Sequence, residues 1–209
     1  MKKLLSLSLA LLAAAAMTVP TLAASHTVQR GDTMWKLAVQ YQVGTSEIID
    51  ANPQVANPNL IYPGDVLTIP ETDASVRACE QEVVRLVNAE RAKHGLAALT
   101  EDWELSRVAR YKSQDMHDNR YFAHNSPTYG TPFRMLRAFG LSYRTAGENI
   151  AMGYAAPAAV VAGWMNSEGH RANILSSAYT KIGVGYVADG HYWTQQFIGR
   201  DDEFHRIKR

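Results

Sequence analysis

The sequence predicts an α+β protein built from two domains that follow one another along the chain. Residues 26–70 show two strand-like segments around two helical patterns, and residues 77–199 show four helical patterns followed by two strands. The 209 residues are 46% apolar and 20% charged, which is typical of soluble globular domains. We therefore expect a small domain, a linker over residues 71–76, a larger layered domain and a charged tail over residues 200–209.

The first 24 residues are typical of a secretory signal peptide. Two lysines precede an apolar run over residues 4–17, and small residues end the segment, so cleavage is expected after Ala23 or Ala24. The alternative is a retained membrane anchor, but a run of about 14 residues is short for a bilayer that needs about 20. A proline and a glycine interrupt the other apolar stretch, residues 151–165, so no stable membrane span is expected.

The charge balance argues against a nucleic-acid partner. Removing the predicted signal peptide takes two of the 21 basic residues and none of the 20 acidic ones, so the formal charge becomes −1. This is not the basic excess that binds phosphate backbones. The single cysteine, Cys79, cannot form an internal disulfide, and its helical spacing with Val83, Leu86 and Val87 favours a buried structural thiol over a nucleophile.

Residues 26–70 are predicted to fold in the order strand, helix, helix, strand. The strands are expected over residues 27–30 and 66–69, where polar and apolar residues alternate. The groups "NPN" and "YPG" mark tight turns before the last strand. The candidate N-caps are Asp32 or Thr33 for the first helix and Thr45 or Ser46 for the second.

With "VQRGDTMWKLA", "NP" and "NPNLIYPGDVLTIP" in register, this segment resembles the LysM module over its whole length. LysM modules bind glycans that contain N-acetylglucosamine, mainly peptidoglycan and chitin, in a shallow groove between two loops. The resemblance implies a groove formed by Gly31, Asp32, Thr33 and Met34 in the first loop and by Pro58, Asn59, Leu60 and Ile61 in the second.

The chemistry of these loops suits a sugar. Backbone groups can bond acetamido groups, while Met34, Leu60 and Ile61 can cover the apolar faces of sugar rings. The alternative for Gly31 and Pro58 is that they only shape turns. One shallow module should bind weakly, because it buries little area against the entropy of association. Export and the bacterial character of the second domain favour peptidoglycan over chitin.

The second domain begins with four helical patterns and ends with two strands. The predicted helices cover residues 76–94, a segment from Thr100 onward, "TPFRMLRAFG" with Thr131 as its cap, and a segment from Pro157 through Trp164 into "WMNSEGHRANIL". The strands "KIGVGYV" and "HYWTQQFIG" are joined by "ADG", which suits a tight hairpin. Helices on a small antiparallel sheet predict an α+β layered domain.

Four ordered motifs, "MHDNRYFAHNSP", "AGENIA", "GWMNSEGHRANILSSAYTKIGVGYV" and "YWTQQF", resemble the bacterial branch of the CAP superfamily of cysteine-rich secretory, antigen 5 and pathogenesis-related 1 proteins. The resemblance implies an α-β-α sandwich with a cavity lined by two histidines and two acids. It assigns His124, Glu148 and His170 to that cavity. The family places the second acid where this chain has Ser167, with Glu168 one residue later.

The residue types themselves allow two kinds of chemistry. Two imidazoles and a carboxylate suit zinc, for which His124 and His170 are the candidate ligands and which is the one cofactor that the sequence suggests. They equally suit general acid and base chemistry, because a neighbouring carboxylate moves the pKa of a histidine across neutrality. Since His124, Glu148 and His170 lie in three separate segments, only the tertiary structure can bring them together.

Each site residue also has a purely structural interpretation. His124 precedes "NSP" and can stabilise a turn, and Glu148 can cap backbone groups in a turn at "AGEN". His170 can lie near the start of a helix entered through Ser167, where a neutral imidazole is favoured over a cation.

Three functions compete on these grounds. The first is a secreted, wall-associated protein that binds peptidoglycan through the LysM module and an unknown ligand through the CAP cavity. The second is an extracellular hydrolase that acts on wall material or peptides, with Glu148 and Glu168 as the carboxylates that a glycosidase needs. The third is a role in spore or envelope assembly. The chain has no "GxSxG" motif and Cys79 lacks a "DCSG" setting, so binding is favoured over catalysis.

Overall fold

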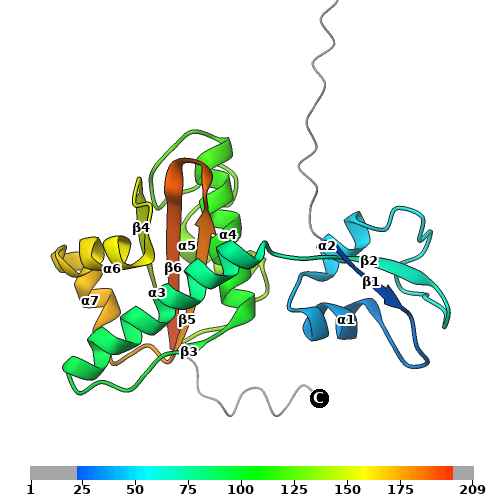
Figure 1. Ribbon diagram of the computed structural model, residues 1–209, viewed down its shortest axis with the longest axis horizontal. Helices are drawn as coiled ribbons and strands as arrows, with labels where there is room; N and C mark the ends of the chain where they lie inside the picture. The colour runs from blue at the N-terminus through cyan, green and yellow to red at the C-terminus, as the bar shows by residue number, and fades with distance from the viewer. Residues whose placement is uncertain (1–22, 200–209) are drawn as a thin grey trace, which may run out of the picture.

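The computed structural model describes residues 23–199 and has the α+β fold that the sequence predicts. Figure 1 shows a smaller first domain, coloured blue to cyan, beside a larger second domain in which helices lie on both sides of a sheet. The charged tail and the predicted signal peptide, apart from its last two residues, lie outside the described residues. Within residues 23–199, no helix is long and apolar enough to cross a bilayer.

The first domain has the predicted order of elements but a different first strand. Its elements are β1 (Ala23–Thr27), α1 (Met34–Tyr41), α2 (Thr45–Asp50) and β2 (Val66–Pro70), and β1 pairs antiparallel with β2. The prediction of a strand over residues 27–30 was wrong, because pairing with β2 ends at Thr27. The chain then turns, with the amide of Gln29 donating to the Asp32 carboxylate and Gly31 at a φ of 94° that favours glycine.

Only one of the predicted helix caps in this domain is a side-chain cap. Thr33 accepts a hydrogen bond from the amide of Lys36 at the start of α1, as predicted. Neither Thr45 nor Ser46 caps α2, which begins after Gly44 without a side-chain cap. The Ser46 hydroxyl instead donates to Glu47 at 2.8 Å.

A buried asparagine ties this domain together. The Asn52 side chain, in a residue only 1% exposed, donates to the carbonyls of Ile48 and Thr68 and accepts from the amide of Thr68 and the side chain of Gln54. It therefore joins the end of α2 to β2 over a core of seven buried side chains. These are Val28, Met34, Leu37, Ala38, Ile48, Leu67 and Ile69.

We expect Asn52→Ala to lower the free energy of unfolding of the first domain by about 2 kcal/mol, because it leaves backbone groups of Ile48 and Thr68 without partners. Calorimetry should show the loss in the transition of this domain. Gln54→Ala removes a single bond from an exposed side chain and should change stability by less than about 0.5 kcal/mol. Equal losses from both variants would contradict this role for Asn52.

The second domain is a three-layer sandwich. Its sheet has the order β3-β5-β6-β4, in which β3 and β5 are parallel and the other pairs are antiparallel. Helices α4 and α5 cover one face, and α3, α6 and α7 cover the other. The strands are β3 (Thr100–Glu101), β4 (Thr145–Met152), β5 (Lys181–Val187) and β6 (Tyr192–Gly199). The helices are α3 (Ala74–Lys93), α4 (Trp103–Asp118), α5 (Pro132–Ala138), α6 (Pro157–Met165), α7 (Glu168–Ile174) and the short 3-10 turn η1 (Asp189–His191).

The structure corrects three predictions for this domain. Thr100 begins strand β3 rather than a helix, and Asp102 caps α4 by accepting from the amide of Leu105. The helix expected to continue through Trp164 breaks at residues 166–167 into α6 and α7. Helix α3 begins at Ala74 after its cap Asp73, so the linker is shorter than the predicted 71–76.

Strand β4 is the largest difference from the prediction. The sequence predicts no strand here, and a turn at "AGEN" was only the structural alternative for Glu148, but residues 145–152 form an edge strand paired with β6, with Glu148 opposite Gln196. Both side chains point towards α4, because Gly183, which is paired with Gln196, faces the backbone of Leu105. Glu148 therefore lies in the middle of a buried strand and not in a capping turn.

Cys79 is a free thiol that is partly exposed and contacts the larger core of the second domain. This core includes the buried Val83 and Val87, which follow Cys79 along the same face of α3. Cys79 thus packs against the core as its spacing predicts, but it is only partly buried and not fully buried as expected.

Candidate functional site

The candidate site of the second domain lies at the open edge of the sheet, where β4 is the outermost strand. Glu148 comes from the middle of β4, His124 from the loop between α4 and α5, and His170 from α7. The α4–α5 loop and α7 are on opposite faces of the sheet, so they can meet only around this edge. The open edge therefore brings three distant segments to one place.

His124 and Glu148 are in direct contact. The distance from His124 Nδ1 to Glu148 Oε1 is 2.8 Å, and Gln196 Nε2 donates to Glu148 Oε2 at 2.5 Å. The Glu148 side chain is 2% exposed, whereas that of His124 is 52% exposed. A carboxylate acceptor favours the tautomer with the proton on Nδ1, which leaves Nε2 of His124 for other contacts. The buried Glu148 carboxylate therefore orients the half-exposed imidazole of His124.

A buried lysine fixes the backbone around His124. Lys112 is 1% exposed on α4, and its Nζ donates to the carbonyls of Ala123 and His124 at 2.7 and 3.1 Å and to the Tyr121 hydroxyl at 2.8 Å. These acceptors match the three donors of an ammonium group. Burial lowers the pKa of Lys112, while the carboxylates of Glu148 and Asp115 act in the opposite direction.

Asp115, one turn further along α4, holds the rest of the same loop. Its carboxylate accepts hydrogen bonds from side chains of residues before and after His124, which are Asn119, Tyr121, Ser126 and Thr128. Burial tends to raise the pKa of Asp115, but the hydroxyls of Thr128, Tyr121 and Ser126 outweigh it and the pKa is lowered. The ionised carboxylate therefore organises residues 119–128 around the candidate site.

His170 lies near this pair without a hydrogen bond to it. Its backbone carbonyl accepts from Asn149 Nδ2 at 3.1 Å, and Asn173 bonds both Asn149 and the carbonyl of Glu148. Burial and the charge of the nearby His124 lower the pKa of the His170 ring, so its neutral form is favoured. Within residues 23–199, no hydrogen bond links this ring to His124 or Glu148.

The fourth predicted position stays a prediction. Ser167 is the N-cap residue of α7 and is partly buried, but its hydroxyl makes no capping bond to the helix. Glu168 is exposed in the first turn of α7, where a negative charge stabilises the positive end of the helix. Of the two, only Ser167 has the burial expected of a residue that lines a cavity.

The described residues do not assemble the zinc site that the sequence suggests. Among residues 23–199, no group of three His, Cys, Asp or Glu side chains is placed to hold a metal ion. Both oxygens of Glu148 are already hydrogen-bonded, to His124 and Gln196. Within residues 23–199, the three side chains that the sequence singles out are therefore not arranged as the ligands of a catalytic zinc.

Gln196, Lys112 and Asp115 belong to the site but were not among the predicted residues. The signal that could have found Gln196 is the pair of polar residues in the strand "YWTQQFIG", both of which are fully buried. A buried amide needs partners, and Gln196 supplies one to Glu148 while its Oε1 has none among the described residues. Lys112 and Asp115 are charged residues three apart on a helix, a pattern that usually marks a solvated face.

Most residues assigned to the first loop of the LysM groove stabilise the loop or the core in the structure. Asp32 accepts from the amide of Gln29 at 2.9 Å and contacts His26 at 2.8 Å, and these bonds lower its pKa. Thr33 caps α1. Met34 is only 4% exposed and belongs to the core, so the expectation that its side chain covers a sugar face was wrong. Gly31 remains exposed at the tip of the loop.

The second loop exposes apolar side-chain surface, which the first loop does not. Asn59 and Leu60 are exposed, Leu60 by 52%, while Pro58 and Ile61 are partly buried. A groove of about 350 Å³ lies on this side of the domain and includes Leu60. It is lined by Gln54, Val55, Ala56, Asn57, Leu60, Tyr62, Asp65, Val66 and Leu67, so it extends along β2 and not towards Gly31.

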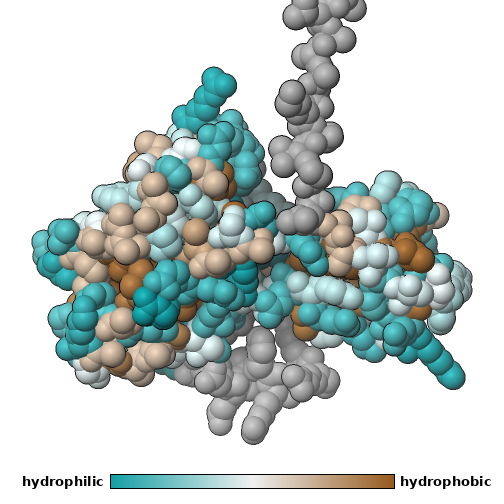
Figure 2. Space-filling view, in the orientation of Figure 1, coloured by the Kyte–Doolittle hydropathy of each residue, from teal (hydrophilic) through white to brown (hydrophobic). Residues whose placement is uncertain are grey.

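On one face of the molecule, exposed apolar groups lie in small separate areas. On the face shown in Figure 2, hydrophobic residues appear as brown and tan areas among hydrophilic ones in both domains. The groove beside the second loop is different in kind, because the exposed side chains of Leu60, Tyr62 and Val66 all lie along it. An aromatic and aliphatic groove with amide side chains at its edge is a surface on which a sugar ring can lie.

Comparison with known proteins identifies both domains. Residues 84–197, more than half of the chain, match the model of the cysteine-rich secretory protein family (CAP), and residues 26–70 match the LysM domain. The chain therefore belongs to the cysteine-rich secretory protein family and carries a LysM domain before its CAP domain. This confirms the resemblances on which the sequence-based predictions rest.

Individual relatives support the same assignment. The uncharacterized protein YkwD of Bacillus subtilis (strain 168) is 59% identical over 133 residues, which are 64% of this chain and 52% of YkwD. The crystal structure of an extracellular protein containing a SCP domain from Bacillus anthracis has 36% identity and a TM-score of 0.58, covering 66% of this chain and 47% of that one. The chain thus matches about half the length of each of these proteins.

A third relative matches a shorter part of the chain. The spore coat assembly protein ExsA of Bacillus cereus is 38% identical over 52 residues, which are 25% of this chain and 8% of ExsA. The LysM domain of this chain suggests binding to a carbohydrate, and the ligand of the CAP domain is unknown.

Proposed function

We propose that the protein is secreted, associates with the cell wall through binding of its LysM domain to the N-acetylglucosamine of peptidoglycan, and binds a further ligand at the His124–Glu148 site of its CAP domain. The LysM match is the observation that carries this proposal, because this module suggests carbohydrate binding. The apolar run and small residues of the first 24 positions support export. The similarity to an extracellular protein containing a SCP domain from Bacillus anthracis agrees with that location.

The surface of the LysM domain suits this ligand. Leu60 and Tyr62 are 52% and 57% exposed along the groove, and Gln54 and Asn57 offer amide groups beside them. Aromatic and aliphatic side chains cover the apolar face of a sugar, while amides bond its acetamido and hydroxyl groups. A shallow groove of this kind gives weak binding per module, which suits a protein that is retained on a wall with many repeating sites.

The geometry of the CAP site favours an enzyme as the second candidate. A buried carboxylate orients the His124 imidazole and leaves Nε2 towards solvent, which is the arrangement of a general base. No described nucleophile contacts that nitrogen, and no metal ligand set is assembled within residues 23–199. We therefore place ligand binding before hydrolysis of wall material.

Assembly of a spore or envelope layer is the third candidate. It is supported by the similarity of this chain to the spore coat assembly protein ExsA, which covers 52 residues, a quarter of the chain. In this candidate the LysM domain still binds a wall polymer, and the CAP domain contacts another protein rather than a small ligand.

Incubation with purified peptidoglycan separates the first two functions. The protein is expected to sediment with the insoluble polymer and to release no soluble fragments, and deletion of residues 26–70 is expected to abolish sedimentation. Fragments that disappear in His124→Ala would establish the hydrolase instead. A variant that still sediments without residues 26–70 would overturn the role proposed for the LysM domain.

A further inference from the structure

The LysM and CAP domains meet at a polar contact that neither family match explains. Only residues 71–73 separate β2, which ends at Pro70, from α3, which begins at Ala74. Asp73 caps α3 by accepting from the amides of Ser75 and Val76, so the end of this short link is itself held in place. Such a link allows little freedom between the domains.

A bidentate ion pair crosses the junction. Arg107 of α4 contacts Glu47 of α2, with Nε at 2.5 Å from Oε1 and Nη2 at 2.8 Å from Oε2. The same Nη2 donates to the Ser46 hydroxyl at 3.1 Å, and the Tyr111 hydroxyl donates to Glu47 Oε1 at 2.9 Å. The planar guanidinium matches the carboxylate with two parallel bonds, which fixes orientation as well as distance.

The surroundings of this pair make it stronger than an ordinary surface salt bridge. The side chains of Arg107 and Glu47 are only 20% and 23% exposed. The guanidinium carbon lies 5.4 Å from the ring centroid of Tyr111 and 5.1 Å from that of Phe139, so two aromatic rings of the CAP domain support the cation. Pairs of this kind lose less to solvent screening than exposed pairs do.

The pKa shifts agree with this geometry. Burial tends to raise the pKa of Glu47, but the hydrogen bonds from Arg107 and Ser46 outweigh it, so the pKa is lowered. Burial and the neighbouring Glu47 carboxylate raise the pKa of Tyr111 to about 12, which keeps its hydroxyl protonated and able to donate.

A second contact supports the junction from another side. Arg77 of α3 donates through Nη2 to the side chain of Gln42, which follows α1, at 3.4 Å. Arg77 is held by Glu101 at 2.8 Å, so its position is set within the CAP domain. Two contacts and a three-residue link together define one orientation of the domains.

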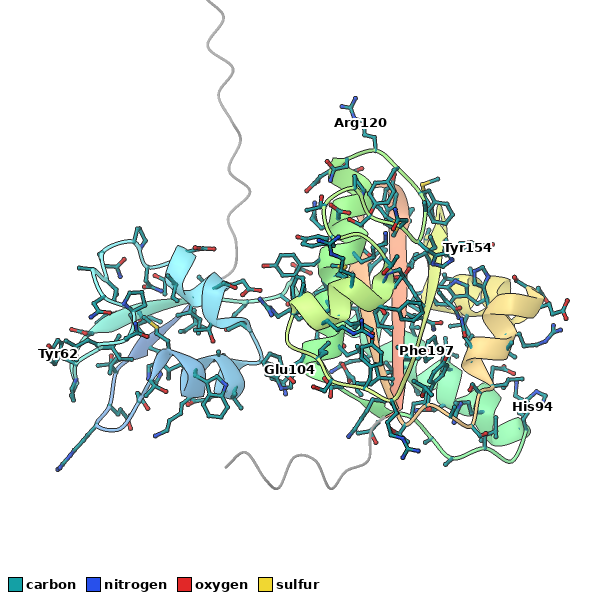
Figure 3. All side chains as sticks on the ribbon, turned by 180° about the vertical axis from the view of Figure 1, so that it is seen from behind. Tyr62, His94, Glu104, Arg120, Tyr154 and Phe197 are labelled. Atoms are coloured by element: carbon teal, nitrogen blue, oxygen red, sulfur yellow. The ribbon has the colours of Figure 1, made fainter. Side chains whose placement is uncertain are left out.

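We propose that the Glu47–Arg107 pair docks the LysM domain on the CAP domain as one rigid body, with the two candidate binding sites at opposite ends. Figure 3 shows Tyr62, beside the LysM groove, at the end of its domain away from the CAP domain. Figure 1 shows β4 and α7, which carry Glu148 and His170 of the CAP site, on the side of the CAP domain away from the LysM domain.

The docking determines where the CAP site lies once the LysM domain has bound a glycan as proposed above. A LysM domain seated on a polymer strand holds the CAP site on the far side of the molecule and directs it away from that strand. The ligand of the CAP site is then supplied from the space around the wall rather than from the glycan in the LysM groove.

Nitrogen-15 relaxation and residual dipolar couplings of the full protein test the docking. The wild-type protein is expected to show one rotational correlation time and one alignment tensor for both domains. Glu47→Gln, which removes the charge and keeps the size, should give the LysM domain a shorter correlation time and a separate tensor. Arg107→Gln tests the same pair from the CAP side, so that a folding defect in one variant does not hide the result.

Glu82→Gln is the matched control, because it removes the same charge from an exposed pair with Arg85 inside α3 and should leave one tensor. Separate tensors in the wild-type protein, or one tensor in both junction variants, would overturn the docking. Sedimentation with peptidoglycan should be unchanged in Glu47→Gln, so failure of the docking and failure of glycan binding are separate results.

Discussion

Gly185→Ala is expected to unfold the CAP domain or to destabilise it by at least about 3 kcal/mol. A Cβ atom at Gly185 would lie 2.1 Å from the carbonyl carbon of Ala109 and from the amide nitrogen of Arg110. Both neighbours are backbone atoms of α4, so no side chain can rotate to make room. Helix α4 would have to move away from β5, and it carries the residues that hold the site and the domain junction.

Gly169→Ala provides the control for the same chemical change. A Cβ atom at Gly169 meets nothing within 4 Å, and the residue lies in α7, so alanine should stabilise the domain by up to about 1 kcal/mol through helix propensity. Urea unfolding followed by circular dichroism measures both variants. A Gly185→Ala protein as stable as the wild type would show that α4 does not pack against the backbone of β5 as closely as the structure indicates.

Elements with strong local signals were the predictable ones. Thr131 caps α5 and Pro132 occupies its first turn, as the sequence predicts. Strand β4 has no such signal, because residues 147–151 are buried whichever face they point to, and the alternation of polar and apolar residues that reveals a half-buried strand is lost. The glycines of β5 also conceal a close contact between helix and sheet that only the fold reveals.

The candidate site was predictable only where the family resemblance assigns residues to it. His124 and Glu148 were expected to share a cavity, and the structure places them in contact. Their supports could not be read in the same way, because the burial of Lys112 and Asp115 depends on how a loop folds over α4. The spacing of Lys112 and Asp115 on α4 predicts that both face solvent, but the loop that folds over the helix buries them.

For the glycan groove, the family resemblance assigns more residues to ligand contact than the structure supports. The resemblance assigns eight residues in two loops, but in the first loop the structure gives Asp32 and Thr33 local bonding roles and buries Met34 in the core. A motif records which residues recur together and does not separate those that shape a loop from those that contact a ligand. Burial and hydrogen bonding make that distinction. Among the assigned apolar side chains, they leave Leu60 exposed and free to cover a sugar ring.

Lys112→Met is expected to destabilise the CAP domain by about 3 kcal/mol and to release the loop that carries His124. Methionine keeps the length and burial of the side chain but removes three donated hydrogen bonds, so the carbonyls of Ala123 and His124 lose their partner. The carboxylates of Asp115 and Glu148 also lose their attraction to the buried positive charge of Lys112.

Hydrogen exchange separates this role from a general loss of stability. Relative to the wild type, amide exchange in Lys112→Met should accelerate more in residues 119–128 than in β5 and β6, because the loop opens before the sheet unfolds. Lys93→Met is the control: its side chain is 66% exposed in a pair with Glu90, so the same substitution should change stability by less than about 0.5 kcal/mol. Uniformly faster exchange throughout the domain would mean that Lys112 supports the fold as a whole rather than the position of His124.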